Sequence, residues 1–257
     1  MRTHRLYPIV MLVALVGAAC SPNEEPSATR AGDSPSSVSA ASSIMEDDGY
    51  AVEIDPANFV DRIDNRYFPL EPGTVFRLRG VTEDGIENET VRVTDRTRTV
   101  MGVRTTVVKD VMRTNGDISE RTHDWYAQDR EGNVWYFGEE TAEYKNGKIL
   151  NRHGSWEAGK DGALPGIIMN ATPQVTDSFR QEFYEGEAED MFWVVATGEA
   201  RSIPLGRFDD TVRVLEWTPL EPKVVVTKTY APGVGLVSER ALSGGKEDVV
   251  LVDVRRP

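Results

Sequence analysis

Most of the chain alternates between apolar and polar residues with the two-residue period of a β-strand. From residue 74 onward, short alternating segments are separated by Asp84-Gly85, Met101-Gly102, Asn115-Gly116 and Asn146-Gly147. Gly and Asn tolerate positive φ, so such pairs are typical of tight hairpin turns. The pattern resumes after residue 176 and continues to the end of the chain. It predicts an antiparallel up-and-down meander.

The fold class predicted from this pattern is all-β. The chain holds about a dozen strand-like segments, no long amphipathic helix and no alternation of strands with helices. So many strands must close into a barrel or curl into a strongly curved half-barrel, because a flat sheet would leave long edges exposed. Asp55 and Pro56, followed by Phe59 and Ile63 four residues apart, predict one short N-terminal helix.

One segment, residues 153–176, loses the periodicity for 24 residues. A stretch of that length without regular structure is often a lid or a binding loop in a compact domain. Its apolar residues would then face a ligand, and they are Trp156, Ile167, Ile168 and Met169.

The densest aromatic stretch is Trp125 to Glu140, "WYAQDREGNVWYFGEE". A type I turn over Asp129–Gly132 would place Tyr126 opposite Tyr136, and Trp125, Trp135 and Phe137 on the other face. A sheet with one face in water would not need aromatic residues on both faces. Either the hairpin is sandwiched between a core and a covering loop, or its tyrosines line the inside of a barrel.

The N-terminal sequence predicts that the β domain is anchored to a membrane. Arg2 and Arg5 precede a short apolar run and then Cys20, which predicts a signal peptide over residues 1–19. The sequence around Cys20 resembles the lipobox of bacterial lipoproteins, although Gly17 replaces the usual Leu. The resemblance implies a lipidated Cys20, an extracytoplasmic location and a membrane contact through the lipid anchor. We expect residues 20–48 to form a disordered tether that begins at the lipidated Cys20, and residues 49–257 to form a single β domain.

The formal net charge of the chain is −13. Such a surface repels phosphate backbones, so we expect no nucleic-acid partner. The oligomeric state cannot be inferred from these features.

Reactive residue types are scarce. Beyond the predicted signal peptide the histidines are His123 and His153, and neither has metal-ligand spacing. The acids between Glu182 and Asp190 could gather around a hard cation, but a solvated hairpin tip is the favoured interpretation. We expect no metal and no cofactor, and no motif identifies a catalytic residue.

Three motifs carry a family resemblance: "NRYFPLEPGT", "DWYAQDREGNVWYFGE" with "GSWEAGKDGALPGIIM", and "YAPGVGLV". Together they resemble a family of uncharacterised bacterial secreted lipoproteins. The first and last are more loosely similar to envelope lipoprotein-carrier-like proteins with curved β-sheets. Neither resemblance implies an activity, so no catalytic residue is transferred.

The function these features favour is binding of an apolar or aromatic small molecule inside the barrel. The candidate ligand-binding residues are Tyr126, Tyr136, Trp125, Trp135, His153 and Trp156. Two alternatives stay open: an envelope enzyme using His153 and the 153–176 segment, with non-enzymatic action favoured, and an interaction lipoprotein without a small ligand.

Overall fold

The computed structural model describes residues 49–257, so the predicted signal peptide, Cys20 and the tether lie outside the described residues. Within them, no helix has the length and apolar character needed to cross a membrane. The elements are η1 (Pro56–Asn58), β1 (Phe59–Val60), β2 (Val75–Thr82), β3 (Gly85–Val100), β4 (Val103–Thr114), β5 (Asp117–Asp129), β6 (Val134–Lys145), β7 (Lys148–Asn151), β8 (Trp156–Glu157), β9 (Leu164–Met169), β10 (Ser178–Arg180), β11 (Glu182–Phe183), β12 (Met191–Ile203), β13 (Gly206–Trp217), β14 (Val225–Ala231), β15 (Gly235–Ser243) and β16 (Glu247–Arg255).

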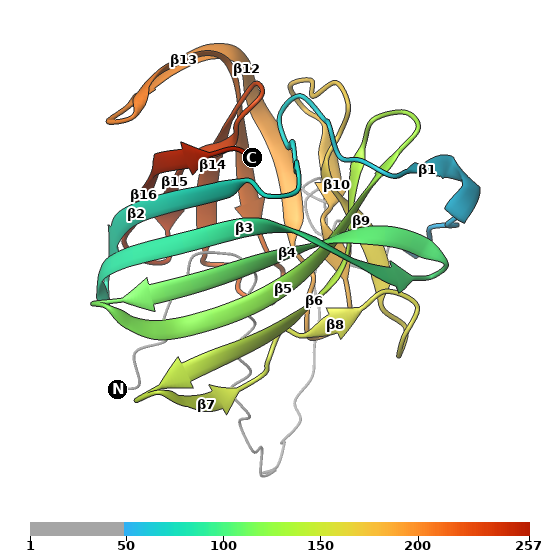
Figure 1. Ribbon diagram of the computed structural model, residues 1–257, viewed down its shortest axis with the longest axis horizontal. Coiled ribbons are helices and arrows are strands. Elements are labelled where there is room, and N and C mark those ends of the chain that lie inside the picture. Colours follow the sequence, from blue (N-terminus) through green and yellow to red (C-terminus); the bar gives the residue numbers. More distant parts are fainter. Residues whose placement is uncertain (1–48) are drawn as a thin grey trace, which may run out of the picture. The chain divides into compact units, whose positions relative to one another are not determined.

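The strands form one antiparallel sheet that curls into a nearly closed barrel (Figure 1), which confirms the predicted fold class. Strands β2 to β6 pair in chain order, as do β12 to β16, and β16 then pairs with β2. The predicted turns are present, and Met101, Asn115 and Asn146 each have positive φ. Within each of these two runs every strand therefore lies beside its sequence neighbour, and the last strand returns to the first long one.

The barrel closes at a seam made by a single short segment. Residues Ser178–Arg180 pair with β12 on one side, and Glu182–Phe183 pair with β9 on the other. Gln181 joins the two, and its N–H donates to the carbonyl of Asp190 at 2.8 Å. One stretch of chain thus changes partner midway, which brings the two ends of the sheet together.

The predicted N-terminal helix is a single 3-10 turn over Pro56–Asn58. Asp55 caps it as expected, because its side chain accepts a hydrogen bond from the Ala57 N–H at 2.9 Å. The chain then becomes extended, and Phe59 and Val60 pair with the end of β5. The spacing of Phe59 and Ile63 therefore did not reflect a longer helix.

The prediction of a structureless lid over residues 153–176 is wrong in its central part. Trp156–Glu157 and Leu164–Met169 are strands β8 and β9, and both pair with β6. The sequence "LPGIIM" hides its strand character because Pro165 and Gly166 interrupt the apolar pattern. Ile167, Ile168 and Met169 consequently belong to the barrel wall.

Gly166 is expected to be essential for closing the seam. A Cβ at this position would lie 2.3 Å from the Gln181 carbonyl carbon and 2.4 Å from the Arg180 carbonyl oxygen, so backbone would have to move. We expect Gly166→Ala to lower the free energy of unfolding by at least about 2 kcal/mol, through overpacking against rigid backbone. Thermal unfolding and amide exchange in β9 and β10 measure this. The control is Ile167→Val on the same strand, which should cost about 1 kcal/mol; equal losses would contradict the argument.

Candidate functional site

The hairpin of β5 and β6 has the pairing predicted from its sequence. Tyr126 lies opposite Tyr136, and Ala127 opposite Trp135. The two tyrosine rings stack with centroids 4.8 Å apart and planes 21° apart. Gly132 has positive φ and Asp129 accepts hydrogen bonds from Asn133, so turn geometry explains the polar residues at the tip.

A β-bulge at Gly138 changes which residues of β6 point inward. The register shifts between the Asp124/Glu139 pair and the Tyr126/Tyr136 pair, so β6 holds one extra residue there. Gly138 has a φ of 129°, and a Cβ on it would lie 2.4 Å from the Trp156 carbonyl oxygen. The bulge lets Tyr136 and Glu139, three positions apart, both face the barrel interior.

The outer face of this hairpin is covered by other parts of the chain. The Phe59 ring packs edge-on against Trp135 and Phe137, with centroid distances of 6.4 and 5.5 Å. The Arg98 guanidinium lies 4.1 Å from the centre of the Trp125 ring. Both structural explanations for aromatic residues on two faces therefore apply: a barrel interior on one side and a covering layer on the other.

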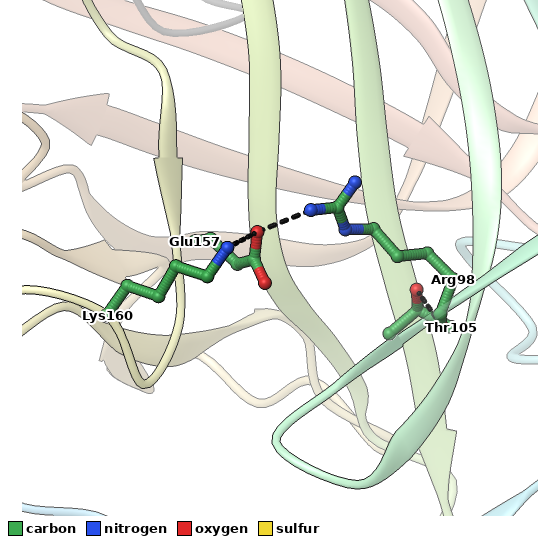
Figure 2. Close-up of polar contacts among 4 residues, drawn as sticks. All are labelled: Arg98, Thr105, Glu157 and Lys160. Atoms are coloured by element: carbon green, nitrogen blue, oxygen red, sulfur yellow. Dashed lines mark hydrogen bonds and ion pairs between the residues drawn. The ribbon is translucent and has the colours of Figure 1, made fainter.

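Arg98, whose guanidinium lies over Trp125, also belongs to a small ionic network with Glu157 and Lys160 (Figure 2). The Glu157 carboxylate lies between Arg98 of β3 and Lys160, at 2.5 and 2.7 Å. Burial opposes ionisation of Glu157, but its hydrogen bonds from Lys160 and Arg98 lower its pKa overall. This network fastens β8 to β3 across the outside of the hairpin, so its charges have a structural role.

The barrel interior holds a partly open cavity of about 130 Å³. Its wall combines apolar, tyrosine and charged side chains from strands all around the barrel. The lining residues are Phe68, Pro69, Leu70, Phe76, Leu78, Glu89, Val91, Val108, Asp110, Asp124, Tyr126, Tyr136, Ile168, Gln181, Glu216, Lys228, Tyr230, Val234, Gly235, Leu236 and Glu239.

The lining residues are arranged in two layers along the barrel. On four strands an apolar or tyrosine residue and a charged residue are two positions apart: Val91 and Glu89 on β3, Val108 and Asp110 on β4, Tyr126 and Asp124 on β5, Tyr230 and Lys228 on β14. The charged residue has the lower number on β3, β5 and β14, and the higher number on antiparallel β4. All four charged residues therefore lie toward the same end of the barrel.

The apolar layer lies toward the end that holds the β3–β4, β5–β6 and β14–β15 turns, here called the mouth. Residues 61–70, here called the mouth strap, run between β1 and β2 across this end (Figure 1). Gln128 accepts hydrogen bonds from the N–H groups of Asp64 and Asn65, at 2.9 and 2.8 Å. At the other side, Gly233 donates to the Arg66 carbonyl at 2.6 Å.

The mouth strap brings two of the sequence motifs together. Phe68, from "NRYFPLEPGT", packs edge-on against Tyr126 at 5.4 Å and tilted against Tyr230 at 6.3 Å. Val234 and Leu236, from "YAPGVGLV", line the same cavity. The covering segment of the barrel is therefore the mouth strap and not the 153–176 segment.

The charged layer is strongly unbalanced toward carboxyl groups. Its one lysine among the lining residues, Lys228, lies 2.6 Å from Glu216 and 3.9 Å from Glu239. Burial alone lowers the pKa of Lys228, but the two carboxylates raise it well above its ordinary value. The lysine is therefore a fixed cation that offsets part of the interior charge.

Burial raises the pKa of the interior carboxyl groups. Burial raises that of Asp124 to about 7, against hydrogen bonds from Tyr136 and Tyr126 that lower it. For Asp110, burial and then the neighbouring Glu89 carboxyl raise the pKa well above its ordinary value. Deeper in the barrel, burial together with Glu89 raises that of Glu87 to about 8. The interior carboxyls therefore keep their protons to higher pH than exposed carboxyls do.

The acids between Glu182 and Asp190 are not a solvated hairpin tip throughout, so that prediction is wrong for its two ends. Glu182 and Asp190 are buried, with exposed fractions of 0% and 3%. Burial and then Asp190 raise the pKa of Glu182 well above its ordinary value. Within residues 49–257, no group of three or more His, Cys, Asp or Glu side chains is arranged to hold a metal ion.

The structure brings two of the six predicted ligand-binding residues to the cavity, Tyr126 and Tyr136. Trp156 packs edge-on against Tyr136 at 5.4 Å, behind the cavity wall. Trp125 and Trp135 lie on the covered outer face, and His153 is exposed in the turn before β8. The serine beside it, Ser155, donates to the Thr141 carbonyl at 3.1 Å, so it joins β6 to the β8 segment.

The interior carboxyls were missed as site residues. A signal for them was present, because Glu89, Asp110 and Asp124 each stand two positions from Val91, Val108 and Tyr126 and so share their face of the strand. The mouth strap was missed because two prolines were read only as a break before the first strand.

Comparison with known proteins gives no family. No protein-family model matches the chain, and no curated protein matches it. Among solved structures, a protein of Parabacteroides distasonis ATCC 8503 described as a "putative lipoprotein" aligns with 74% of this chain and 99% of its own. The identity is 14% and the TM-score 0.40.

Proposed function

We propose that the protein is a lipid-anchored, extracytoplasmic β-barrel that binds an apolar or aromatic small molecule. The observation that carries the proposal is the cavity beneath the mouth strap, whose apolar layer includes Phe68, Tyr126 and Leu236. Enclosed, largely apolar spaces with a few polar groups are the usual form of small-molecule sites. A filled interior would have favoured an interaction protein without a ligand.

The tyrosine pair suits such a ligand in two ways. Tyr126 and Tyr136 both line the cavity, and aromatic rings favour contact with aromatic or alkyl groups. The Tyr136 hydroxyl donates to Asp124 at 2.8 Å, so this ring is fixed in place. A wall fixed before binding reduces the entropy lost when a ligand is ordered.

The proposal is tested on protein purified from its own envelope. Native mass spectrometry under mild conditions should show an added mass, and organic extraction should release a molecule with an apolar or aromatic group. Repeated isolation of protein with no added mass, together with no binding of small aromatic probes, would argue against a ligand. Loss of incorporated lipid in Cys20→Ser would test the anchor separately.

Filling the cavity is expected to prevent binding. Leu236→Trp adds a large ring to a lining position, and we expect the affinity for a small aromatic alcohol to fall at least about tenfold, roughly 1.4 kcal/mol. Isothermal titration calorimetry measures the change. The control is Val252→Trp on the exposed side of β16, where the residue is 38% exposed. Equal affinities for the two variants would place the ligand elsewhere.

A further inference from the structure

Asp110 is a buried carboxyl group that faces the cavity without a hydrogen-bond donor. Its exposed fraction is 4%, and among the described residues no N–H or hydroxyl donor reaches its oxygens, which lie beside the Glu89 carboxyl. Its close neighbour is another carboxyl, Glu89, and two carboxyls can share a hydrogen bond only when one of them is protonated. Leaving a buried acceptor unmatched costs about 1–3 kcal/mol, so the site favours a ligand that supplies a donor.

The same layer shows what charge the donor should carry. The charged side chains that line the cavity are Lys228 and five acids: Glu89, Asp110, Asp124, Glu216 and Glu239. Lys228 lies against Glu216 and, at a longer distance, Glu239. Within the part of the chain that the structure describes, the Oε1 atom of Glu239 and that of Gln181 also lack a hydrogen-bond partner. A positively charged donor complements this layer, whereas an anion would be repelled.

The adjoining layer shows what the rest of the ligand should be. Phe68, Tyr126 and Tyr136 lie next to the carboxyl layer and present an aromatic wall. A dry cavity of about 150 Å³ holds a benzene ring in an engineered protein, so a space of about 130 Å³ suits one ring or a short alkyl chain. An aromatic wall also stabilises a nearby ammonium group. An organic cation fits both layers, which a bare metal ion does not.

We propose that the cavity binds a small primary amine in its ammonium form, with one aromatic ring or a short alkyl chain. The ammonium lies against Asp110 and Glu89, and the apolar part lies against Tyr126 beneath the mouth strap. This inference rests on the proposed function and adds the chemical class of the ligand. It assigns Asp110 as a ligand-binding residue.

Binding of such a cation should release a proton from the protein. Without a ligand, burial and the facing carboxyls raise the pKa of Asp110; those carboxyls are Glu89 on β3 and Glu120 and Asp124 on β5. Lys228 on β14 is the facing cation, and it acts on Glu89. A bound ammonium favours the ionised carboxylate, so its arrival displaces a shared proton.

Calorimetry on the full-length chain in lipid nanodiscs tests the inference with three probes: phenethylamine, phenethyl alcohol and phenylpropionate. We expect the amine to bind at least tenfold more tightly than the alcohol, and the anion not to bind; the threshold is about 1.4 kcal/mol. In the Asp110→Asn variant, the affinity for the amine should fall to that for the alcohol, and the affinity for the alcohol should not change. Asp248→Asn, which alters an exposed position on β16, should change neither.

The outcomes separate this inference from the proposed function. If the alcohol binds and the amine binds no more tightly, the ammonium site is overturned while the apolar site survives. If none of the three probes binds the wild-type chain, both proposals fail. Should Asp110→Asn not fold, titration of the wild-type chain in two buffers of different ionisation enthalpy decides instead. Release of about one proton per amine supports the site, and no release overturns it.

Discussion

Raising the pH from about 5 to about 9 is expected to lower the free energy of unfolding by several kcal/mol. Burial, in most cases with help from neighbouring carboxyls, raises the pKa of Glu87 to about 8 and those of Asp124, Asp190 and Glu247 to about 7. The ordinary values are 4.5 for the glutamates and 3.8 for the aspartates. Between the ordinary and the raised pKa values, the folded state holds protons that the unfolded state has lost.

The sign of the effect follows from this difference in bound protons. Because the folded state binds more protons, stability is greatest below about pH 4 to 5 for these groups and falls until the pH passes their raised pKa values. For each group, a difference of one pKa unit between the folded and unfolded states changes the free energy of unfolding by about 1.4 kcal/mol. We expect the melting temperature to fall by at least about 10 °C over this range. Thermal unfolding at a series of pH values measures it.

Matched variants identify the groups responsible. Glu87→Gln combined with Glu247→Gln should flatten the profile, because both carboxyls are buried, at 2% and 6% exposure. Glu131→Gln changes an exposed carboxyl in the β5–β6 turn and should leave the profile as it is. A wild-type stability that stays level or rises with pH would contradict the burial of protonated carboxyls.

Replacing Lys228 with methionine is expected to destabilise the barrel by about 3–5 kcal/mol, the usual cost of removing one partner of a buried ion pair. Lys228 and Glu216 have exposed side-chain fractions of 8% and 1%, and their charged atoms are 2.6 Å apart. Without the lysine, Glu216 and Glu239 lose the buried cation that lies against both of them. Burial already raises the pKa of Glu239, and without the lysine this carboxyl avoids an unpaired charge only by protonation, so the loss should be larger at alkaline than at acidic pH.

Chemical denaturation of two further variants checks this reason. Lys223→Met removes an exposed lysine shortly before β14 and should cost less than about 0.5 kcal/mol. Adding Glu216→Gln to Lys228→Met should recover part of the loss, because it removes one of the uncompensated carboxyls. If Lys228→Met and Lys223→Met were equally stable, the ion pair would have no net effect on folding.

The sequence predicted the parts of the fold that depend on local geometry. Asn115-Gly116 and Asn146-Gly147 form their turns because few other residues accept positive φ there, and the Asp129–Gly132 turn determines that Tyr126 faces Tyr136. Strand β9 was not predicted, because its pairing with β6 overrides the weak strand propensity of Pro165 and Gly166.

The candidate site was predictable only in part, because polar residues occur on both faces of the sheet. Polar residues normally mark the solvent face of a strand, so an acid such as Asp110 or Glu89 reads as exposed. In this barrel both faces carry polar residues, and the alternation alone does not tell inside from outside. The mouth strap gave no signal either, since its hydrogen bonds to Gln128 and Gly233 depend on residues far away in the sequence.

The pairing of β16 with β2 has a consequence for how the protein is made. The first long strand must wait, with one edge unpaired, while about 170 residues of intervening chain are synthesised and folded. The barrel cannot close before β16 is available to pair with β2, so we expect its carboxyl-rich interior to stay in contact with water until then. Closure then removes water from those groups in one late event, so the ambient pH at that moment should influence how fast the chain matures.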